Sequence, residues 1–355
     1  MSVFFYSFFF LLSSVFFFID DFKKGKYKNY FILFLSILLI IVASGRWMVG
    51  GDWTSYYELS LINGIEKLSW SPIYVLINFI AYYLKIGIFG VNLALSSLLF
   101  FSFIYMSKKL KINALFLMPL FLATIYFQLL LGYSRQSLAL SFLFLFFGVY
   151  VNNKLRKSIF FFVLAVLSHL SSIVFLPMLL CLLTKSNIKI YKLKYPVLVA
   201  FFLLAVFIYF NFTYYKISFD IFVEKDRTYV SNGVFFRMIP NFLILIIFFN
   251  YRNEIIEKYP NLKFFFYYSI FIIIFFLFNI TILFKYTTII DRLNIYNVIF
   301  HMIVLNFLLD KLKKNNINLV NFFSISLHVF YFMIFGGWLL FGTYAVYWQN
   351  YKFIQ

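Results

Sequence analysis

The chain has 355 residues and a formal net charge of +19; 64% of its residues are hydrophobic and 12% are charged. No soluble fold buries so much apolar surface, so the composition excludes a water-soluble domain and predicts an all-α polytopic membrane protein. The basic residues lie mostly beside apolar runs, which indicates membrane topology rather than nucleic-acid binding. With one cysteine, Cys181, the chain has no disulfide framework and no cysteine-rich metal site.

Eleven apolar segments are candidates for the membrane-spanning helices of one transmembrane domain, 1–355. In chain order they are 2–19, 30–45, 89–107, 113–131, 136–151, 158–183, 195–212, 236–250, 264–284, 293–309 and 319–341. The first has neither the basic leading region nor the small-residue cleavage site of a signal peptide, so we expect a retained helix.

The basic residues also predict orientation, because positive charge normally stays in the cytoplasm. Placing every basic cluster there requires 158–183 to enter and leave on the cytoplasmic side, as a hairpin broken near His169. The cytoplasmic side then holds 18 Lys and 2 Arg, and the outer side holds 6 Lys and 5 Arg. Segments 46–88 and 213–235 are expected on the outer face, although 72–87 could instead cross the membrane.

Arginine on the outer face departs from this charge rule and needs an explanation. Convergent guanidinium groups bind phosphate and pyrophosphate through paired hydrogen bonds. We therefore expect an anionic ligand near the outer arginines, which are Arg46, Arg135, Arg227, Arg237 and Arg292.

The first outer motif, Arg46–Glu58, combines two glycines that permit a tight turn with an acidic residue and several aromatic rings. Asp52 could simply cap the helix that follows, and tryptophan and tyrosine also anchor membrane interfaces. Taken together, Arg46, Asp52 and Tyr56 offer a cation, a carboxylate and a ring that can stack on a sugar.

Two further motifs lie between or within apolar runs. Arg135 and Gln136 open a helix, whose first N–H groups favour anions; the alternative is an arginine that only anchors the interface. His169 lies among serines at the expected break in 158–183, and an ionisable side chain there is a functional candidate. Its titration range suits proton transfer. The other two histidines, His301 and His328, are interpreted as structural.

The remaining polar segments are Asp220–Arg237 and Thr287–Arg292. A loop as long as the first is often a lid or a binding loop, and Arg237 at the start of a helix is its strongest candidate. In the second, Asp291 and Arg292 are adjacent and cannot share one helix face. One could cap a helix while the other points into a cavity.

Several motifs of nucleotide and metal enzymes are missing from the sequence: a Walker loop, a Rossmann fingerprint, zinc-ligand spacing, a hydrolase elbow and a DxD pair. We therefore expect no cofactor. We also expect no metal, because guanidinium groups can stabilise a pyrophosphate instead.

The order Arg-x-x-x-Gly-x-Asp at 46–52, Tyr56, Arg135-Gln136, a histidine on a broken apolar segment and Arg292 resembles the EpsG-type branch of bacterial Wzy polysaccharide polymerases. The resemblance runs over most of the chain. It implies a GT-C-like glycosyltransferase of the bacterial cytoplasmic membrane, with its active site facing the periplasm or the outside. Its substrates would be oligosaccharides on undecaprenyl pyrophosphate, held in membrane lipid, and its protein partners a chain-length regulator and a flippase.

For such a reaction, the residues themselves suggest roles. Four arginines would neutralise the leaving pyrophosphate: Arg46, Arg135, Arg237 and Arg292. Gln136 and Tyr56 would help to bind pyrophosphate or sugar. The proton of the acceptor hydroxyl would go to one of three candidates, His169, Asp52 or Asp291. We favour His169, and Asp52 could instead position the acceptor.

Two other functions fit the same sequence. A flippase for the same lipid-linked sugar would need an inward-open path and usually shows repeat symmetry. A membrane O-acyltransferase of polysaccharide would need a route for a cytoplasmic acyl donor.

Overall fold

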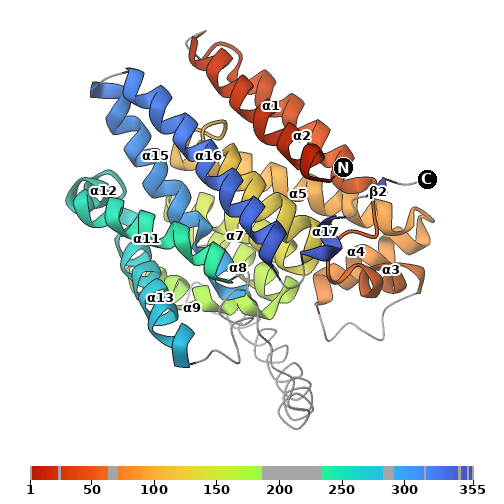
Figure 1. Cartoon of the computed structure of the whole chain (residues 1–355). Coiled ribbons are helices and arrows are strands. Elements are labelled where there is room, and N and C mark those ends of the chain that lie inside the picture. Colours follow the sequence, from red (N-terminus) through yellow and green to blue (C-terminus); the bar gives the residue numbers. More distant parts are fainter. Residues whose placement is uncertain are drawn as a thin grey trace.

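Figure 1 shows the computed structural model, a bundle of helices whose two chain ends lie on the same side. The structure describes residues 2–22, 25–62, 71–185, 234–282, 292–315, 317–342, 345–349 and 352–353. Up to residue 150 the elements are α1 (Ser2–Phe22), α2 (Lys28–Ser44), β1 (Arg46–Trp47), α3 (Trp53–Leu61), α4 (Pro72–Tyr83), α5 (Gly87–Leu110), α6 (Met118–Leu120), the π-helix η2 (Phe121–Leu130) and α7 (Ser134–Tyr150).

The remaining elements are mostly helices as well. They are α8 (Leu155–Ser168), η3 (Leu170–Phe175), α9 (Leu176–Lys185), α11 (Val234–Asn250), α12 (Arg252–Lys258), η5 (Pro260–Leu262), α13 (Lys263–Ile282), η7 (Ile295–Asn297), α15 (Val298–Asn315), α16 (Ile317–Phe341), α17 (Val346–Gln349) and β2 (Lys352–Phe353). The predicted all-α class is confirmed, with one short pairing of β1 and β2 beside it.

By length and composition, three helices in the described ranges can cross a membrane: Gly87–Leu110, Arg292–Lys314 and Asn318–Phe341. The pair Met238–Asn250 and Arg252–Lys258, bent by 85°, is a fourth candidate. Most other expected spans correspond to shorter apolar helices, and 195–212 lies outside the described residues. Eleven crossings and a GT-C fold remain predictions.

Helix α7 is the centre of the bundle. Nearly every one of its residues is buried, which is typical of a helix that is apolar on all sides. It packs mainly against α5 and α8. Because α7 is enclosed by its neighbours, its N-terminal turn, with Ser134, Arg135 and Gln136, has a fixed position inside the protein.

The structure describes two segments whose conformation the sequence left open. The helix α8 ends at Ser168, and His169 has extended backbone before η3 and α9 continue the chain, so the break near His169 is present. The helix α4 has 12 residues and is about 18 Å long, short of the ~30 Å hydrocarbon core. The helix alone is too short for a crossing, and the outer-face location of this segment remains a prediction.

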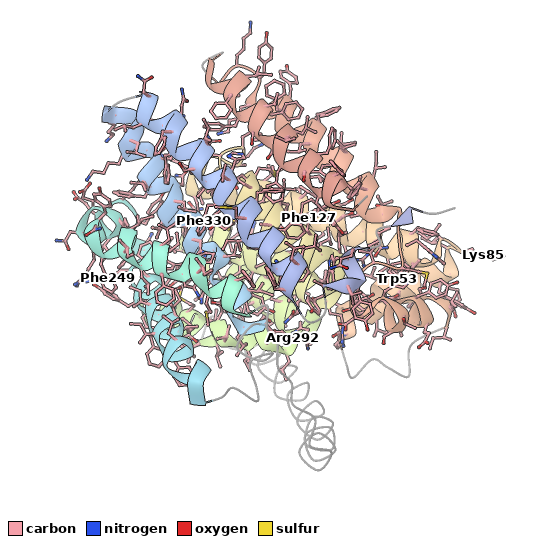
Figure 2. All side chains as sticks on the ribbon, in the orientation of Figure 1. Trp53, Lys85, Phe127, Phe249, Arg292 and Phe330 are labelled. Atoms are coloured by element: carbon pink, nitrogen blue, oxygen red, sulfur yellow. The ribbon has the colours of Figure 1, made fainter. Side chains whose placement is uncertain are left out.

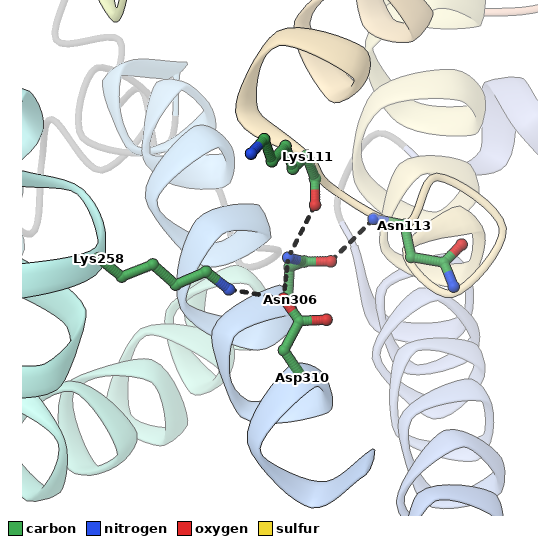
Figure 3. Close-up of polar contacts among 5 residues, drawn as sticks. All are labelled: Lys111, Asn113, Lys258, Asn306 and Asp310. Carbon is green, nitrogen blue, oxygen red and sulfur yellow. Dashed lines mark hydrogen bonds and ion pairs between the residues drawn. The ribbon is translucent and has the colours of Figure 1, made fainter. Parts of the chain in front are cut away.

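The α5–α6 connection and α15 are joined at one end of the bundle through Asn306, as Figure 3 shows. The Asn306 side chain accepts a hydrogen bond from the Asn113 backbone at 2.8 Å and donates one to the Lys111 carbonyl at 3.4 Å. One turn away, Lys258 and Asp310 form an ion pair at 2.6 Å. Three basic segments of the chain, 108–111, 252–263 and 311–314, therefore meet at one end of the structure.

Candidate functional site

One pocket brings together residues from four separate parts of the chain. It is lined by Asp52, Tyr56, Tyr133, Arg135, Gln136, His169 and Arg292. Six of these are candidates from the sequence, and Tyr133 is an addition. Figure 2 labels Arg292, which lies at the end of the bundle away from the α15–α16 turn.

Arg292 and Gln136 offer polar atoms to this pocket. The Nε atom of Arg292 is buried and has no hydrogen-bond partner within the described ranges, and its guanidinium lies 5.4 Å from the centre of the Tyr133 ring. Both amide atoms of Gln136 are likewise buried and unbonded among the described residues. A buried polar group without a partner costs free energy, so both side chains are arranged as if for a ligand.

The Arg135 guanidinium lies over the ring of Tyr56, 5.9 Å from its centre. Because Arg135 and Gln136 are in the first turn of α7, the N-terminal end of the helix dipole adds to the positive charge of Arg135. The pocket thus combines two guanidinium groups with one carboxylate, which favours an anionic ligand.

Asp52 is the residue before α3 but makes no side-chain capping bond to the helix. Instead, its Oδ2 accepts a hydrogen bond from the Tyr56 hydroxyl at 3.1 Å. Burial and the nearby charge of Asp52 raise the pKa of Tyr56 to about 12, so this hydroxyl stays protonated at neutral pH. The capping interpretation of Asp52 is therefore not supported, and the carboxylate is turned toward the pocket.

Arg46 is buried behind the pocket rather than in its lining. Its Nη1 donates to the Leu130 carbonyl at 2.7 Å, and its Nη2 donates to Asn92 at 3.0 Å and Ser134 at 2.7 Å. Its guanidinium therefore joins α5 to the chain on both sides of the η2–α7 turn. The Arg46 guanidinium thus points at protein acceptors beside the turn that carries Arg135 and Gln136, and its contact with pyrophosphate remains a prediction.

The loop that carries Arg46 and Asp52 packs closely against that turn. Gly50 has φ +103°, and a Cβ atom there would lie 2.2 Å from the Leu131 carbonyl oxygen. A Cβ on Gly132 would lie 1.9 Å from the Trp348 ring. Any larger side chain at either glycine would collide with these atoms. The two glycines therefore allow the Gly50 loop, the η2–α7 turn and the Trp348 segment to meet beside the pocket.

The C-terminal segment holds this arrangement from the other side. Trp348 is fully buried, its Nε1 donates to the Phe127 carbonyl at 2.7 Å, and its own carbonyl accepts from Tyr6 at 2.8 Å. The strand β2 pairs with β1, so that Arg46 lies opposite Phe353. Nothing in the sequence pattern shows which distant residues this segment contacts.

His169 approaches the pocket from the break between α8 and η3. Its Nδ1 lies 2.6 Å from the Ser171 hydroxyl, which in turn lies 2.8 Å from the Tyr296 hydroxyl. Tyr296 was not among the sequence candidates, since a tyrosine inside an apolar span carries no signal of its partner. The other two histidines bond elsewhere: His301 to Asn241 at 2.8 Å and His328 to the Ser324 carbonyl at 2.8 Å.

Two candidates and one charged loop remain untested by this geometry. Asp291 and the segment 213–233 lie outside the described residues. Arg237 belongs to α11, but its side chain is outside the described part of the structure.

The structure is a helical membrane protein with a polar pocket, lined by two arginines, at one end of its bundle. The profile of the EpsG family matches residues 29–353, and the chain belongs to that family. Proteins of this family are membrane proteins of polysaccharide biosynthesis, and the family implies a lipid-linked saccharide substrate. No curated protein and no solved structure matches the chain.

Proposed function

We propose that this protein is a polysaccharide polymerase, a GT-C-type glycosyltransferase acting on the outer face of the bacterial cytoplasmic membrane. It moves a growing glycan from undecaprenyl pyrophosphate onto a new lipid-linked repeat unit. A hydroxyl oxygen of the new unit forms a bond to the anomeric carbon of the growing chain. The bond from that carbon to pyrophosphate breaks, its electron pair leaves with the phosphate oxygen, and the hydroxyl proton goes to a base.

The observation that carries the proposal is the convergence of Arg135 and Arg292 with Asp52 and His169 in one pocket. Pyrophosphate gains negative charge as it leaves, and fixed guanidinium donors stabilise that charge most in the transition state. Each such donor is typically worth about 3–4 kcal/mol. The same stabilisation makes a metal unnecessary, and the expectation of a metal-free site remains part of the proposal.

The position of the pocket supports reaction on the outer face. The helix α5 has 24 residues and is about 36 Å long, enough to cross the ~30 Å hydrocarbon core. Asn92, which binds Arg46, is near its first turn, and Lys108 and Lys109 are in its last turn. Since lysines mark the cytoplasmic side, the opposite end carries the pocket.

The test is extension of a lipid-linked repeat unit by the purified protein in liposomes. We expect a ladder of lengthening glycans and release of undecaprenyl pyrophosphate in equal amount to the bonds formed.

A deletion strain separates the alternatives: loss of a polymerase leaves single repeat units on the outer face. Units trapped inside would instead indicate a flippase, and unchanged chain length an O-acyltransferase.

A further inference from the structure

A chain of three side chains lies behind the pocket and fixes the orientation of one imidazole. The Tyr296 hydroxyl is 2.8 Å from Ser171 Oγ, and Ser171 Oγ is 2.6 Å from His169 Nδ1. The Ser171 backbone N–H also points at Nδ1, at 3.3 Å. The His169 backbone is held as well, because its carbonyl accepts from the Ser172 amide at 3.1 Å and hydroxyl at 2.9 Å.

The backbone contact decides which ring nitrogen carries the proton. An amide N–H can only donate, so Nδ1 of His169 must be an acceptor, and the proton of the neutral ring is on Nε2. The Ser171 hydroxyl then donates to Nδ1 and accepts from Tyr296. The Ser171 N–H and O–H then share Nδ1 as their acceptor, and the nitrogen left for the pocket is Nε2, as an N–H donor.

We propose that His169 is a hydrogen-bond donor to the leaving pyrophosphate, set in this orientation by Ser171 and Tyr296, and that Asp52 takes the proton of the acceptor hydroxyl. The inference rests on the proposed function and assigns the base within it. The bond changes are those of glycosyl transfer: the acceptor oxygen bonds to the anomeric carbon, and the phosphate oxygen leaves with the electron pair. The hydroxyl proton ends on the Asp52 carboxylate.

The charges around the pocket favour this division of roles. A histidine base would become a cation beside Arg135 and Arg292, where like charge disfavours it. An N–H donated to pyrophosphate by a neutral ring creates no such cation, and neutral imidazoles act as donors in other enzyme sites. Asp52 loses a negative charge when it takes the proton, and Tyr56 bonds its Oδ2, which leaves Oδ1 for the acceptor.

The proton position can be measured without any activity assay. The chain has three histidines, so imidazole ¹⁵N NMR of the purified protein should give three resolvable rings. We expect Nδ1–H for His328, whose Nδ1 faces a carbonyl oxygen, and Nε2–H for His169 and His301. His169→Gln assigns its signal by removing it. A proton on Nδ1 of His169 would overturn the proposal.

Kinetics test the role of that proton. A glutamine amide can place an N–H donor near the position of Nε2 but cannot act as a base. We expect His169→Ala to lower kcat by about 100-fold or more, while His169→Gln keeps kcat within about tenfold of the unchanged protein. Equal loss in both variants would show that His169 is the base. If the unchanged protein does not extend glycans at all, the proposed function fails instead.

Two further variants test the positioning residues. Ser171→Ala and Tyr296→Phe each remove one hydroxyl, and each should lower kcat by about three- to tenfold with KM unchanged. In Ser171→Ala the backbone N–H still donates to Nδ1, so the NMR signal of His169 should keep the Nε2–H form while kcat falls, and Ser171→Thr should restore kcat. Unchanged kcat in both variants would exclude a positioning role. Size-exclusion profiles and thermal unfolding, compared with the control His328→Gln, show that the variants are folded.

Discussion

Arginines that look equivalent in the sequence have different surroundings in the structure. Arg46 is bonded to three protein acceptors and holds the η2–α7 turn. Arg135 and Arg292 line the pocket, and each lies over a tyrosine ring. The residue type is visible in the sequence and the outer-face location is predicted from it, whereas the direction of a guanidinium depends on distant partners, such as Asn92 and Leu130 for Arg46.

Arg135→Lys should remove most polymerising activity, with kcat lowered by about 100-fold, because an ammonium cannot replace a planar guanidinium that forms two parallel hydrogen bonds. Expression and thermal unfolding should be unchanged. Rates of glycan extension measure the effect. The matched control is Arg252→Lys, since Arg252 is at the basic end and bonds Tyr267 at 3.0 Å. Equal polymer yield from both variants would make Arg135 an ordinary interface residue.

Asp52→Asn should lower kcat by at least about 100-fold, the usual contribution of a general base. The amide oxygen can still accept the Tyr56 hydroxyl bond, so the loop should keep its structure. Binding of a fluorescent lipid-linked repeat unit should stay within about threefold of the unchanged protein, because the proton is taken in the bond-making step rather than in binding. Activity within tenfold of the unchanged protein would contradict the assignment.

At the scale of elements, the apolar helices and the break near His169 follow from local pattern, because hydropathy and small polar residues are local signals. The pairing of β1 with β2 and the burial of Trp348 against Gly132 do not. Those contacts join residues more than 200 positions apart. They depend on how the folded segments fit together, which local sequence patterns do not show. Tyr296 was missed for the same reason.

Gly132→Ala tests the contact between α17 and the η2–α7 turn. The new methyl group would lie 1.9 Å from the Trp348 ring, so the turn or the C-terminal segment must move. Such overpacking typically costs about 1–3 kcal/mol. We expect a lower unfolding temperature and reduced extension rates, because Tyr133 and Arg135 follow directly. Gly336→Ala, with no atom within 4 Å of its added carbon, is the control and should change neither.

At the scale of the whole molecule, the two ends of the helical bundle carry different charged residues. In Figure 1 the α1–α2 turn and the α15–α16 turn lie at the same upper end, and both carry the lysines of predicted cytoplasmic clusters. In Figure 2 Arg292 lies toward the lower end. Charge counting along the sequence anticipates this arrangement for the lysine clusters and for Arg292, although single residues such as Arg252 and Lys85 depart from it.

The two ends of α5 provide the sharpest test of orientation. Lys85 lies just before this helix and Lys109 in its last turn. In a variant with Cys181→Ser, we expect Lys85→Cys to react with a membrane-impermeant maleimide in intact cells, and Lys109→Cys to react only after the membrane is opened. Lys225→Cys should react like Lys85→Cys if 158–183 enters and leaves on one side. Labelling of Lys85→Cys and Lys109→Cys from the same side would show that α5 does not cross, and a cytoplasmic Lys225→Cys would exclude the hairpin. Either result would move the arginines relative to the lysines and remove the physical reason for placing the pocket on the outer face.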